Sequence, residues 1–182
     1  MSVASKGLPG LRGTDHIGIT VPDFEVAADF FENVLGFEPF YEMGPFGSED
    51  DDWMQEMLNV HPRAVIRRVK HYRCGHGPNI ELFEYESPDQ RRKMPKNSDW
   101  GGHHITLYVD DMDAAVAHLR AHDVRLMAGA GPPIAEGPEA GLRSCYFLTP
   151  WDLQMELISY PEGKGYAKDT DRRLWDPRNP AQ

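Results

Sequence analysis

The sequence predicts an α+β fold in which one unit, strand–helix–strand–strand–strand, occurs twice. Two pairs of similar segments indicate the duplication. The first pair places a histidine before alternating aliphatic residues, at residues 15–23 and 103–111. The second pair places a glutamate between aliphatic residues, at residues 79–85 and 154–160. The content of 17 Gly and 15 Pro in 182 residues is above average and agrees with many short strands joined by turns.

The remaining elements of each unit follow in order along the chain. After each histidine-bearing strand, apolar residues recur at helical spacing behind an aspartate that suits a helix N-cap. These apolar residues are Val26, Phe30, Val34 and Leu35 in the first copy, and Met112, Ala115, Val116 and Leu119 in the second. The capping aspartates are Asp23 in the first copy and either Asp110 or Asp111 in the second. Two strand-like runs, residues 64–72 and 142–148, then precede turn signals and the glutamate strands.

The repeat sets the domain organisation. The expected parts are a first module at residues 12–86, a linker at 87–101, a second module at 102–160 and an irregular tail at 161–182. The first copy also has additional residues between its histidine and its glutamate, which we place at 43–62. There, residues 50–58 have the pattern of a short capped helix. Its apolar residues Trp53, Met54 and Met57 are expected to pack under a lid that the insertion forms.

The composition excludes several classes of protein. With 19 Lys and Arg against 29 Asp and Glu, the formal net charge of −10 disfavours binding to nucleic acid or to an anionic membrane. No secretory signal and no long apolar segment are present, and the two cysteines, Cys74 and Cys145, are too few for a disulfide scaffold. We therefore expect a cytoplasmic protein that acts on a small molecule.

Four polar residues fall on strand faces that the helices are expected to leave uncovered, because side chains alternate between the two faces of a strand. The four residues are His16, Glu81, His104 and Glu156. A carboxylate in an apolar strand is costly unless it is paired or bound to a metal. If the two copies pack about a pseudo-twofold axis, the four side chains converge. Their nitrogen and oxygen donors suit a divalent ion such as Zn, Ni, Mn, Co or Fe.

These segments resemble the vicinal oxygen chelate superfamily, also called the glyoxalase/bleomycin-resistance/dioxygenase family. The likeness covers residues 14–160. It rests on Asp15-His16-Ile17-Gly18-Ile19 with Val21-Pro22-Asp23, on Ile80-Glu81-Leu82, on His104-Ile105 with Val109-Asp110-Asp111, and on Tyr146-Phe147 leading through Pro150 to Met155-Glu156-Leu157. The resemblance implies two βαβββ modules that form an open mixed-sheet barrel around a metal. The turn at residues 149–152 and the insertion at 43–62 depart from the family pattern.

The resemblance also implies a chemistry. It implies a metal-dependent isomerase, epimerase or lyase that transfers a proton on a small substrate with two neighbouring oxygens. Glu156 matches the position that is both ligand and base, and Glu81 is the opposing carboxylate. Tyr108 and Arg68 are candidate substrate-binding residues, although the register of Arg68 is open. A homodimer is expected, and the site can form within one chain or across the dimer.

Two other functions stay open, and several histidines receive a plain interpretation. An extradiol dioxygenase would use His16, His104 and Glu156 as a triad, and Glu81 as a second carboxylate disfavours it. A drug-sequestering protein on the same fold would need no metal site. We expect His61, His71 and His76 in loops or on the surface, and the pair His118 and His122 on a solvated helix face.

Overall fold

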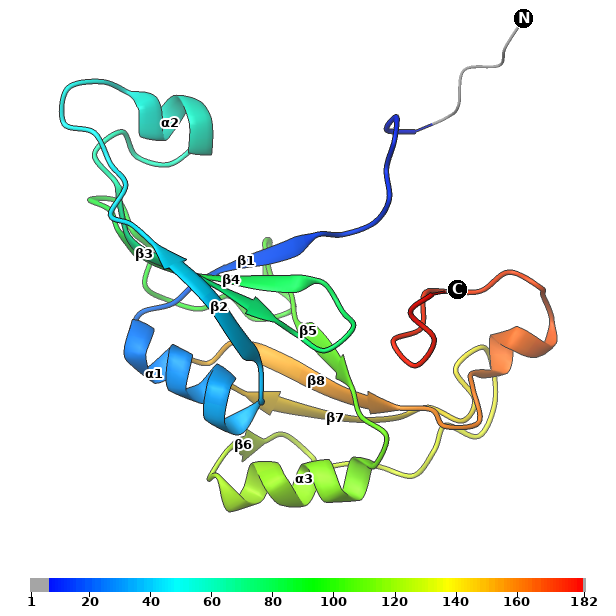
Figure 1. Cartoon of the computed structure of the whole chain (residues 1–182). Helices are drawn as coiled ribbons and strands as arrows, with labels where there is room; N and C mark the ends of the chain where they lie inside the picture. The colour runs from blue at the N-terminus through cyan, green and yellow to red at the C-terminus, as the bar shows by residue number, and fades with distance from the viewer. Residues whose placement is uncertain (1–6, 182) are drawn as a thin grey trace, which may run out of the picture.

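The computed structural model describes residues 7–181 and has the predicted duplicated α+β architecture (Figure 1). The first half contains β1 (His16–Thr20), α1 (Phe24–Asp29), the π-helical turn η1 (Phe30–Val34), β2 (Glu38–Met43), α2 (Trp53–Leu58), β3 (Val65–Arg73) and β4 (Asn79–Glu86). The second half contains β5 (Ile105–Tyr108), α3 (Met112–Ala121), β6 (Arg125–Leu126), β7 (Arg143–Leu148), β8 (Gln154–Ser159) and the 3-10 helix η2 (Gly165–Lys168). The fold class is confirmed.

Each half forms its own four-stranded mixed sheet, with strand orders β1-β4-β3-β2 and β5-β8-β7-β6. The first strand of each half runs parallel to the last, and the other neighbouring strands are antiparallel. The register pairs Gly18 with Glu81 and Thr106 with Glu156. Within the described residues no strand pairing joins the two sheets, so the expected barrel consists of two separate sheets in this chain.

The two main helices begin at the predicted caps. The Asp23 carboxylate accepts a hydrogen bond from the backbone N–H of Val26 at 3.1 Å, and Asp111 accepts from Asp113 and Ala114 at 3.0 and 2.9 Å. These bonds satisfy N–H groups that the first helical turn leaves free. The predicted buried positions of α3 are confirmed for Met112, Val116 and Leu119.

The buried face of α1 differs from the prediction. Val26 is 45% exposed, whereas Phe30 is buried as predicted. The other buried residues of the helix and the turn after it are Phe24, Ala27, Ala28 and Phe31. Phe24, Ala27, Ala28 and Phe31 are spaced i, i+3, i+4 and i+7, which is one helix face. The large aromatic ring of Phe24, rather than Val26, therefore sets the orientation of the helix.

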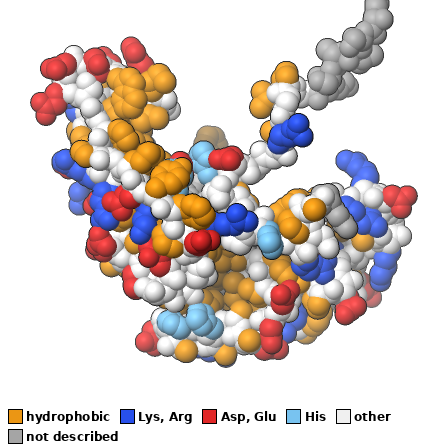
Figure 2. All heavy atoms as spheres, in the orientation of Figure 1, with side chains coloured by type: hydrophobic (Ala, Val, Ile, Leu, Met, Phe, Trp, Pro, Cys, Tyr) orange, Lys and Arg blue, Asp and Glu red, His pale blue; other side chains and the backbone are white. Residues whose placement is uncertain are grey.

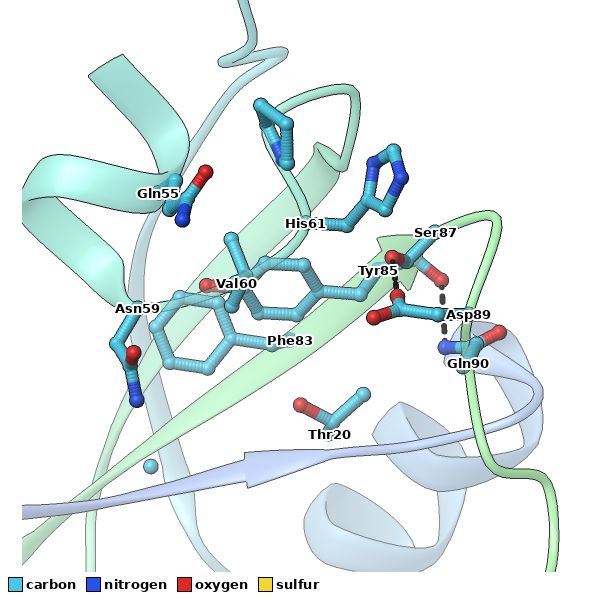
Figure 3. A pocket seen from close by; sticks show the side chains of 12 residues that line it. Thr20, Gln55, Asn59, Val60, His61, Phe83, Tyr85, Ser87, Asp89 and Gln90 are labelled. Atoms are coloured by element: carbon cyan, nitrogen blue, oxygen red, sulfur yellow. Dashed lines mark hydrogen bonds between the residues drawn. The ribbon is translucent and has the colours of Figure 1, made fainter. Parts of the chain in front are cut away.

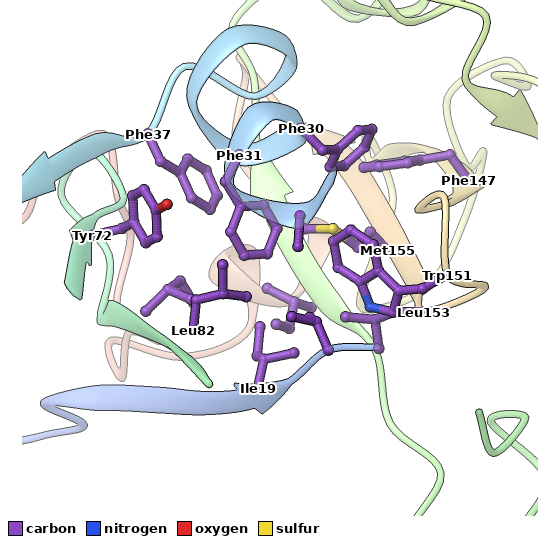
Figure 4. Close-up of a cluster of buried hydrophobic side chains, with 14 of the residues drawn as sticks. Ile19, Phe30, Phe31, Phe37, Tyr72, Leu82, Phe147, Trp151, Leu153 and Met155 are labelled. Carbon is purple, nitrogen blue, oxygen red and sulfur yellow. The ribbon is translucent and has the colours of Figure 1, made fainter. Parts of the chain in front are cut away.

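One hydrophobic core joins the two halves (Figure 4). Phe30 and Phe31 lie between side chains of the first sheet and side chains of the second. The indole of Trp151 meets both rings edge-on, with centroid distances of 5.9 and 5.7 Å. Burying each such side chain contributes about 1.5–3 kcal/mol. The helix-covered faces of both sheets thus share this core.

The turn that departs from the family pattern provides a core residue. Trp151 lies in that turn and is 9% exposed. The strands on either side keep their register, because Leu148 still pairs with Gln154 and Tyr146 with Glu156. A change of turn sequence has therefore left the position of the second glutamate unchanged.

The insertion packs on the first sheet through a second, smaller core. Met54 of α2 is fully buried against Ala64, Ile66 and Val69. Trp53 and Met57 are 42% and 66% exposed, so the prediction that they pack beneath a lid is wrong. A six-residue helix presents only one face to the sheet, and Met54 occupies it.

The tail is more ordered than predicted. It contains η2, and Arg178 donates hydrogen bonds to the carbonyls of Tyr160 and Pro161 and to the carboxylate of Asp176. These bonds fold the tail back onto the end of the second sheet. No helix in the described part of the chain is long and apolar enough to cross a membrane.

Candidate metal and active site

The first predicted ligand pair lies on the face of the first sheet that α1 does not cover, which we call its inner face. Ile80 and Leu82 are buried on the helix side, and Glu81 projects from the opposite side between them. The Nε2 atom of His16 lies 3.1 Å from Oε2 of Glu81. The alternation of side chains in β1 and β4 therefore brings together two residues that are 65 positions apart.

Two further residues hold this pair. The Asp15 carboxylate accepts a hydrogen bond from Nδ1 of His16 at 2.8 Å, and that bond raises the pKa of His16. A histidine that donates from Nδ1 to a carboxylate directs the lone pair of Nε2 outward, as metal-binding histidines do. On the other side, Nε2 of His71 lies 2.6 Å from Oε1 of Glu81, and the His71 ring stacks on Tyr41.

The second predicted pair lies on the inner face of the second sheet, which is the face that α3 does not cover. The Nε2 atom of His104, just before β5, lies 3.3 Å from Oε2 of Glu156. The Thr106 hydroxyl donates to the same carboxylate oxygen at 2.9 Å. The amide of Asn97 lies 3.2 Å from Nδ1 of His104. The second pair therefore has the same geometry as the first but neutral partners.

One aromatic side chain, Tyr146, lies beside the second pair. The ring of Tyr146 lies edge-on to His104, with centroids 5.5 Å apart. Burial raises the pKa of Tyr146, and the negative charge of Glu156 adds to the effect. The phenol therefore stays protonated at neutral pH and can donate a hydrogen bond in this site.

The two pairs do not form one cluster within a single chain. In residues 7–181 no three His, Cys, Asp or Glu side chains meet in an arrangement suited to a metal ion. The reason lies in the packing, because the helix sides of the sheets share one core and each inner face carries its own cavity. The convergence of all four predicted ligands stays a prediction. Within one chain, the four residues form two separate His–Glu pairs.

The cavity on the first inner face has a volume of about 770 Å³ (Figure 3). It begins at Gly18, the residue paired with Glu81, and continues over the rings of Phe83 and Tyr85. The insertion closes the opposite side through residues such as Asn59. The cavity therefore adjoins the first His–Glu pair.

The cavity on the second inner face has a volume of about 420 Å³ and is lined by Thr106, Tyr108 and the tail. Tyr108, predicted to contact substrate, lines this cavity. The Arg178 guanidinium lies over the rings of Tyr108 and Tyr160, 5.6 and 4.6 Å from their centroids. Figure 1 shows the tail, at the right, beside the end of the second sheet.

Arg68, the other predicted substrate-binding residue, lies on the helix side of the first sheet. Its guanidinium binds Glu42 at 2.6 Å and also Glu25, and it covers the ring of Phe24 at 4.0 Å. Arg68 lines neither of the two inner-face cavities. The bulge in β3 between Ile66 and Arg68 shifts the alternation, which the sequence pattern did not reveal.

The structure adds functional candidates that the sequence pattern missed. The prediction that His71 is a loop or surface residue is wrong, because it lies within β3 with 16% of its side chain exposed. Asp15 and Asn97 were not assigned a role either. The signal for Asp15 was its place directly before His16, whereas Asn97 lies in the linker and had none.

Other histidines and the cysteines match their predictions more closely. His118 and His122 are exposed on α3, although Nε2 of His118 also contacts the Val34 carbonyl of the first module at 2.8 Å. Both cysteines are free, and burial raises the pKa of Cys74 to about 11. A thiol with so high a pKa is a poor nucleophile at neutral pH.

The fold and the site together define the class of this protein: two βαβββ modules in one chain, with one His–Glu pair on the inner face of each sheet. Residues 15–147 match the Glyoxalase/Bleomycin resistance protein/Dioxygenase superfamily. A glyoxalase family protein from Bacillus cereus has the same fold, with a TM-score of 0.61 at 18% identity over 87% of this chain and 98% of that one. The chain belongs to this superfamily.

Two relatives of known activity are epimerases. The chain is 42% identical over 175 residues to a 2-epi-5-epi-valiolone epimerase from Actinomyces sp, with 96% of this chain and 94% of the relative covered. It is 28% identical over 144 residues to an ethylmalonyl-CoA/methylmalonyl-CoA epimerase from Cereibacter sphaeroides, with 79% and 92% covered. The chain is therefore an enzyme of the epimerase type.

Proposed function

We propose that this enzyme is a metal-dependent epimerase that inverts a carbon centre next to a carbonyl in a small substrate with neighbouring oxygens. The observation that carries the proposal is the occurrence of one His–Glu pair at equivalent positions on both inner faces. A structural role would not require the same two residue types, in the same relative geometry, on both sheets.

The donor set fits a divalent metal ion. His16 and His104 each have Nδ1 engaged by a neighbour, and each has Nε2 close to a glutamate oxygen. Two imidazole nitrogens and two carboxylates suit Zn, Ni, Mn, Co or Fe. When bound, such an ion acts as a Lewis acid and stabilises negative charge that develops on a substrate oxygen.

The two glutamates divide the proton transfer between them. Epimerisation requires that a proton leaves carbon on one face and returns on the other, with the electron pair of the C–H bond held meanwhile on the carbonyl oxygen. We assign removal to Glu156, whose partner Thr106 is a weak neutral donor. We assign return to Glu81, whose other oxygen is held by His71. No net proton is gained or lost.

We further propose that two copies complete the site, with the first inner face of one copy opposite the second inner face of the other. The proposal accounts for the separate cavities and for exposed apolar side chains near the first face (Figure 2). Those side chains are Phe40, Tyr41, Met43, Trp53 and Met57, with exposures of 61%, 52%, 44%, 42% and 66%. Such a patch is typical of an interface between proteins.

Solvent deuterium exchange tests the activity. The metal-loaded enzyme in D2O should incorporate deuterium at the inverted carbon of 2-epi-5-epi-valiolone or methylmalonyl-CoA, as followed by proton NMR. Chelation should stop the exchange, and a divalent metal should restore it. Exchange that survives complete chelation, or no exchange with either substrate, would refute the proposed function.

Complementation tests the shared site. His16→Ala and His104→Ala should each be inactive alone, because each lacks a ligand in every site. Mixed dimers would contain one site with both defects and one intact site, so random mixing should restore about a quarter of the activity. If mixing restores nothing while the two variants exchange subunits, the site lies within one chain.

A further inference from the structure

The cavity on the first inner face has an aromatic floor. The rings of Phe83 and Tyr85 lie side by side along β4, with centroids 5.5 Å apart and a 34° tilt between them (Figure 3). Gly18 permits this arrangement, because a Cβ atom there would come within 3.2 Å of the Phe83 ring. Aromatic floors of this kind bind flat, partly apolar faces of small molecules.

Neutral hydrogen-bonding groups surround this floor. Gln55 and Asn59 reach in from the insertion, and Thr20 lies on the side of β1 (Figure 3). Within residues 7–181 none of these three side chains has a hydrogen-bond partner on the protein, whereas Gln90 already donates to the Tyr85 carbonyl at 2.9 Å. His61 accepts from the backbone N–H of Arg63 through Nδ1, which leaves Nε2–H as a donor. The wall therefore offers both donors and acceptors.

The charges around the cavity disfavour an anion. None of the lining residues is Lys or Arg. The nearby Arg63 guanidinium is bound to the Ser48 carbonyl and to Asp52. The one lining carboxylate, Asp89, accepts from the Ser87 hydroxyl, and this bond lowers its pKa, so it stays negative at neutral pH. A phosphate or carboxylate group would meet a negative charge here and no cation.

We propose that this cavity binds an uncharged, polyhydroxylated ring, and that the insertion at residues 43–62 thereby sets the substrate class of the enzyme. The C–H face of the ring lies on Phe83 and Tyr85, and its hydroxyls bind Gln55 and Asn59. The proposal deepens the proposed function and rests on it, because the carbonyl end of the ring would then point toward Gly18 and the His16–Glu81 pair. An acyl-CoA, with its phosphates, has no counterpart for its charge in this cavity.

Isothermal titration of the metal-loaded enzyme tests the proposal. The probes are 2-epi-5-epi-valiolone, a phosphorylated form of the same ketone, and methylmalonyl-CoA. The uncharged ketone should bind at least about tenfold more tightly than either anion. Anions that bind as tightly as the ketone, or more tightly, would overturn the proposal.

Variants of the insertion show whether the contacts are the ones named. Gln55→Met keeps the side-chain length, and Asn59→Gly suits the left-handed backbone of that residue, with φ of 54°. Each should weaken ketone binding about 3- to 10-fold, as the loss of one neutral hydrogen bond does. Glu56→Gln, on the same helix but outside the cavity, should bind as the wild type does.

The outcomes separate the two proposals. Ketone binding that is equal in wild type, Gln55→Met and Asn59→Gly would overturn the cavity assignment, even if deuterium exchange continues. Tight ketone binding that weakens in both variants, with no metal-dependent exchange, would support the cavity and refute the epimerase mechanism.

Discussion

The two half-sites have the same strand geometry but different partners. In the first half, Asp15 and His71 hold the His16–Glu81 pair, so a carboxylate and an imidazole act on it. In the second half, an amide and a hydroxyl hold the His104–Glu156 pair. The Glu156 side chain is also less exposed, 11% against 18% for Glu81. This difference agrees with the proposed assignment, in which Glu156 removes the proton and Glu81 returns it.

The largest expected effect is the loss of activity when a residue of the second half-site is replaced. Glu156→Gln should lower kcat for deuterium exchange by about 10³ or more, because an amide cannot accept the proton. His104→Ala should likewise abolish activity, because the second half then has no nitrogen ligand. Initial rates at saturating substrate measure both losses.

The neighbouring histidine is the matched control. His103 is exposed and hydrogen-bonds the Gly101 carbonyl, so His103→Ala should retain activity. If Glu156→Gln keeps most of its rate while His103→Ala loses it, the ligand assignment in the second half is wrong.

Metal content gives the next largest effect. His16→Ala should lose metal affinity more strongly than Glu81→Gln, because an amide oxygen can still act as a weak ligand whereas a methyl group cannot. Inductively coupled plasma analysis after dialysis against a defined metal buffer measures the difference. Equal metal content in His16→Ala, Glu81→Gln, His104→Ala, Glu156→Gln and the wild type would contradict the four-ligand set.

Exchanging the partners of the two histidines sharpens the comparison. Asp15→Asn should weaken metal binding about tenfold, because a carboxylate partner makes the imidazole a stronger ligand than an amide does. Asn97→Asp should strengthen it by a smaller factor, because it introduces the same kind of partner beside His104. Competition with a chromogenic chelator measures both changes, and changes of the same sign in the two variants would show that the partners do not tune the histidines.

The smallest effect compares the ion pairs that join each helix to its sheet. Glu32 accepts from Lys70 at 2.7 Å and from the buried Tyr72 hydroxyl at 2.9 Å, and the bond from Lys70 lowers the pKa of Glu32. Asp113 pairs with Arg143 at 2.8 Å but is 79% exposed. Glu32→Gln should therefore lower the free energy of unfolding by about 1 kcal/mol, and Asp113→Asn by less.

The pH dependence of this effect has a definite sign. Because the folded-state pKa of Glu32 lies below its ordinary value of about 4.3, its contribution is present above that pH and is lost as the pH falls through the folded value. Urea unfolding should show a smaller difference in the free energy of unfolding between wild type and Glu32→Gln at pH 3 than at pH 7. A difference that grows on acidification would contradict the assignment.

Much of the fold and the composition of both half-sites could be predicted from local patterns. The period-two alternation around Glu81 correctly separated buried Ile80 and Leu82 from the inner face, and the same rule worked around Glu156. Asp23 was predicted as a cap from its residue type and position alone. Such features depend on neighbours a few residues apart, which a sequence displays directly.

The features that were missed depend on distant contacts. The bulge in β3 turned Arg68 toward α1, and His71 acquired its role only through pairing with β4. The anchoring of the tail depends on Arg178 lying over Tyr108, 70 positions away. No local periodicity reports such an approach, and the relative placement of the two inner faces is a property of the shared core rather than of either repeat.

The shared core also explains where this enzyme can change. Phe30, Phe31 and Trp151 join the helix-covered sides of both sheets, so substitutions there would disturb both inner faces at once. The insertion at residues 43–62, in contrast, packs on its own small cluster around Met54, at the rim of the first cavity. Engineering directed at that rim can therefore redesign which molecules enter while the scaffold that aligns the reacting groups stays intact.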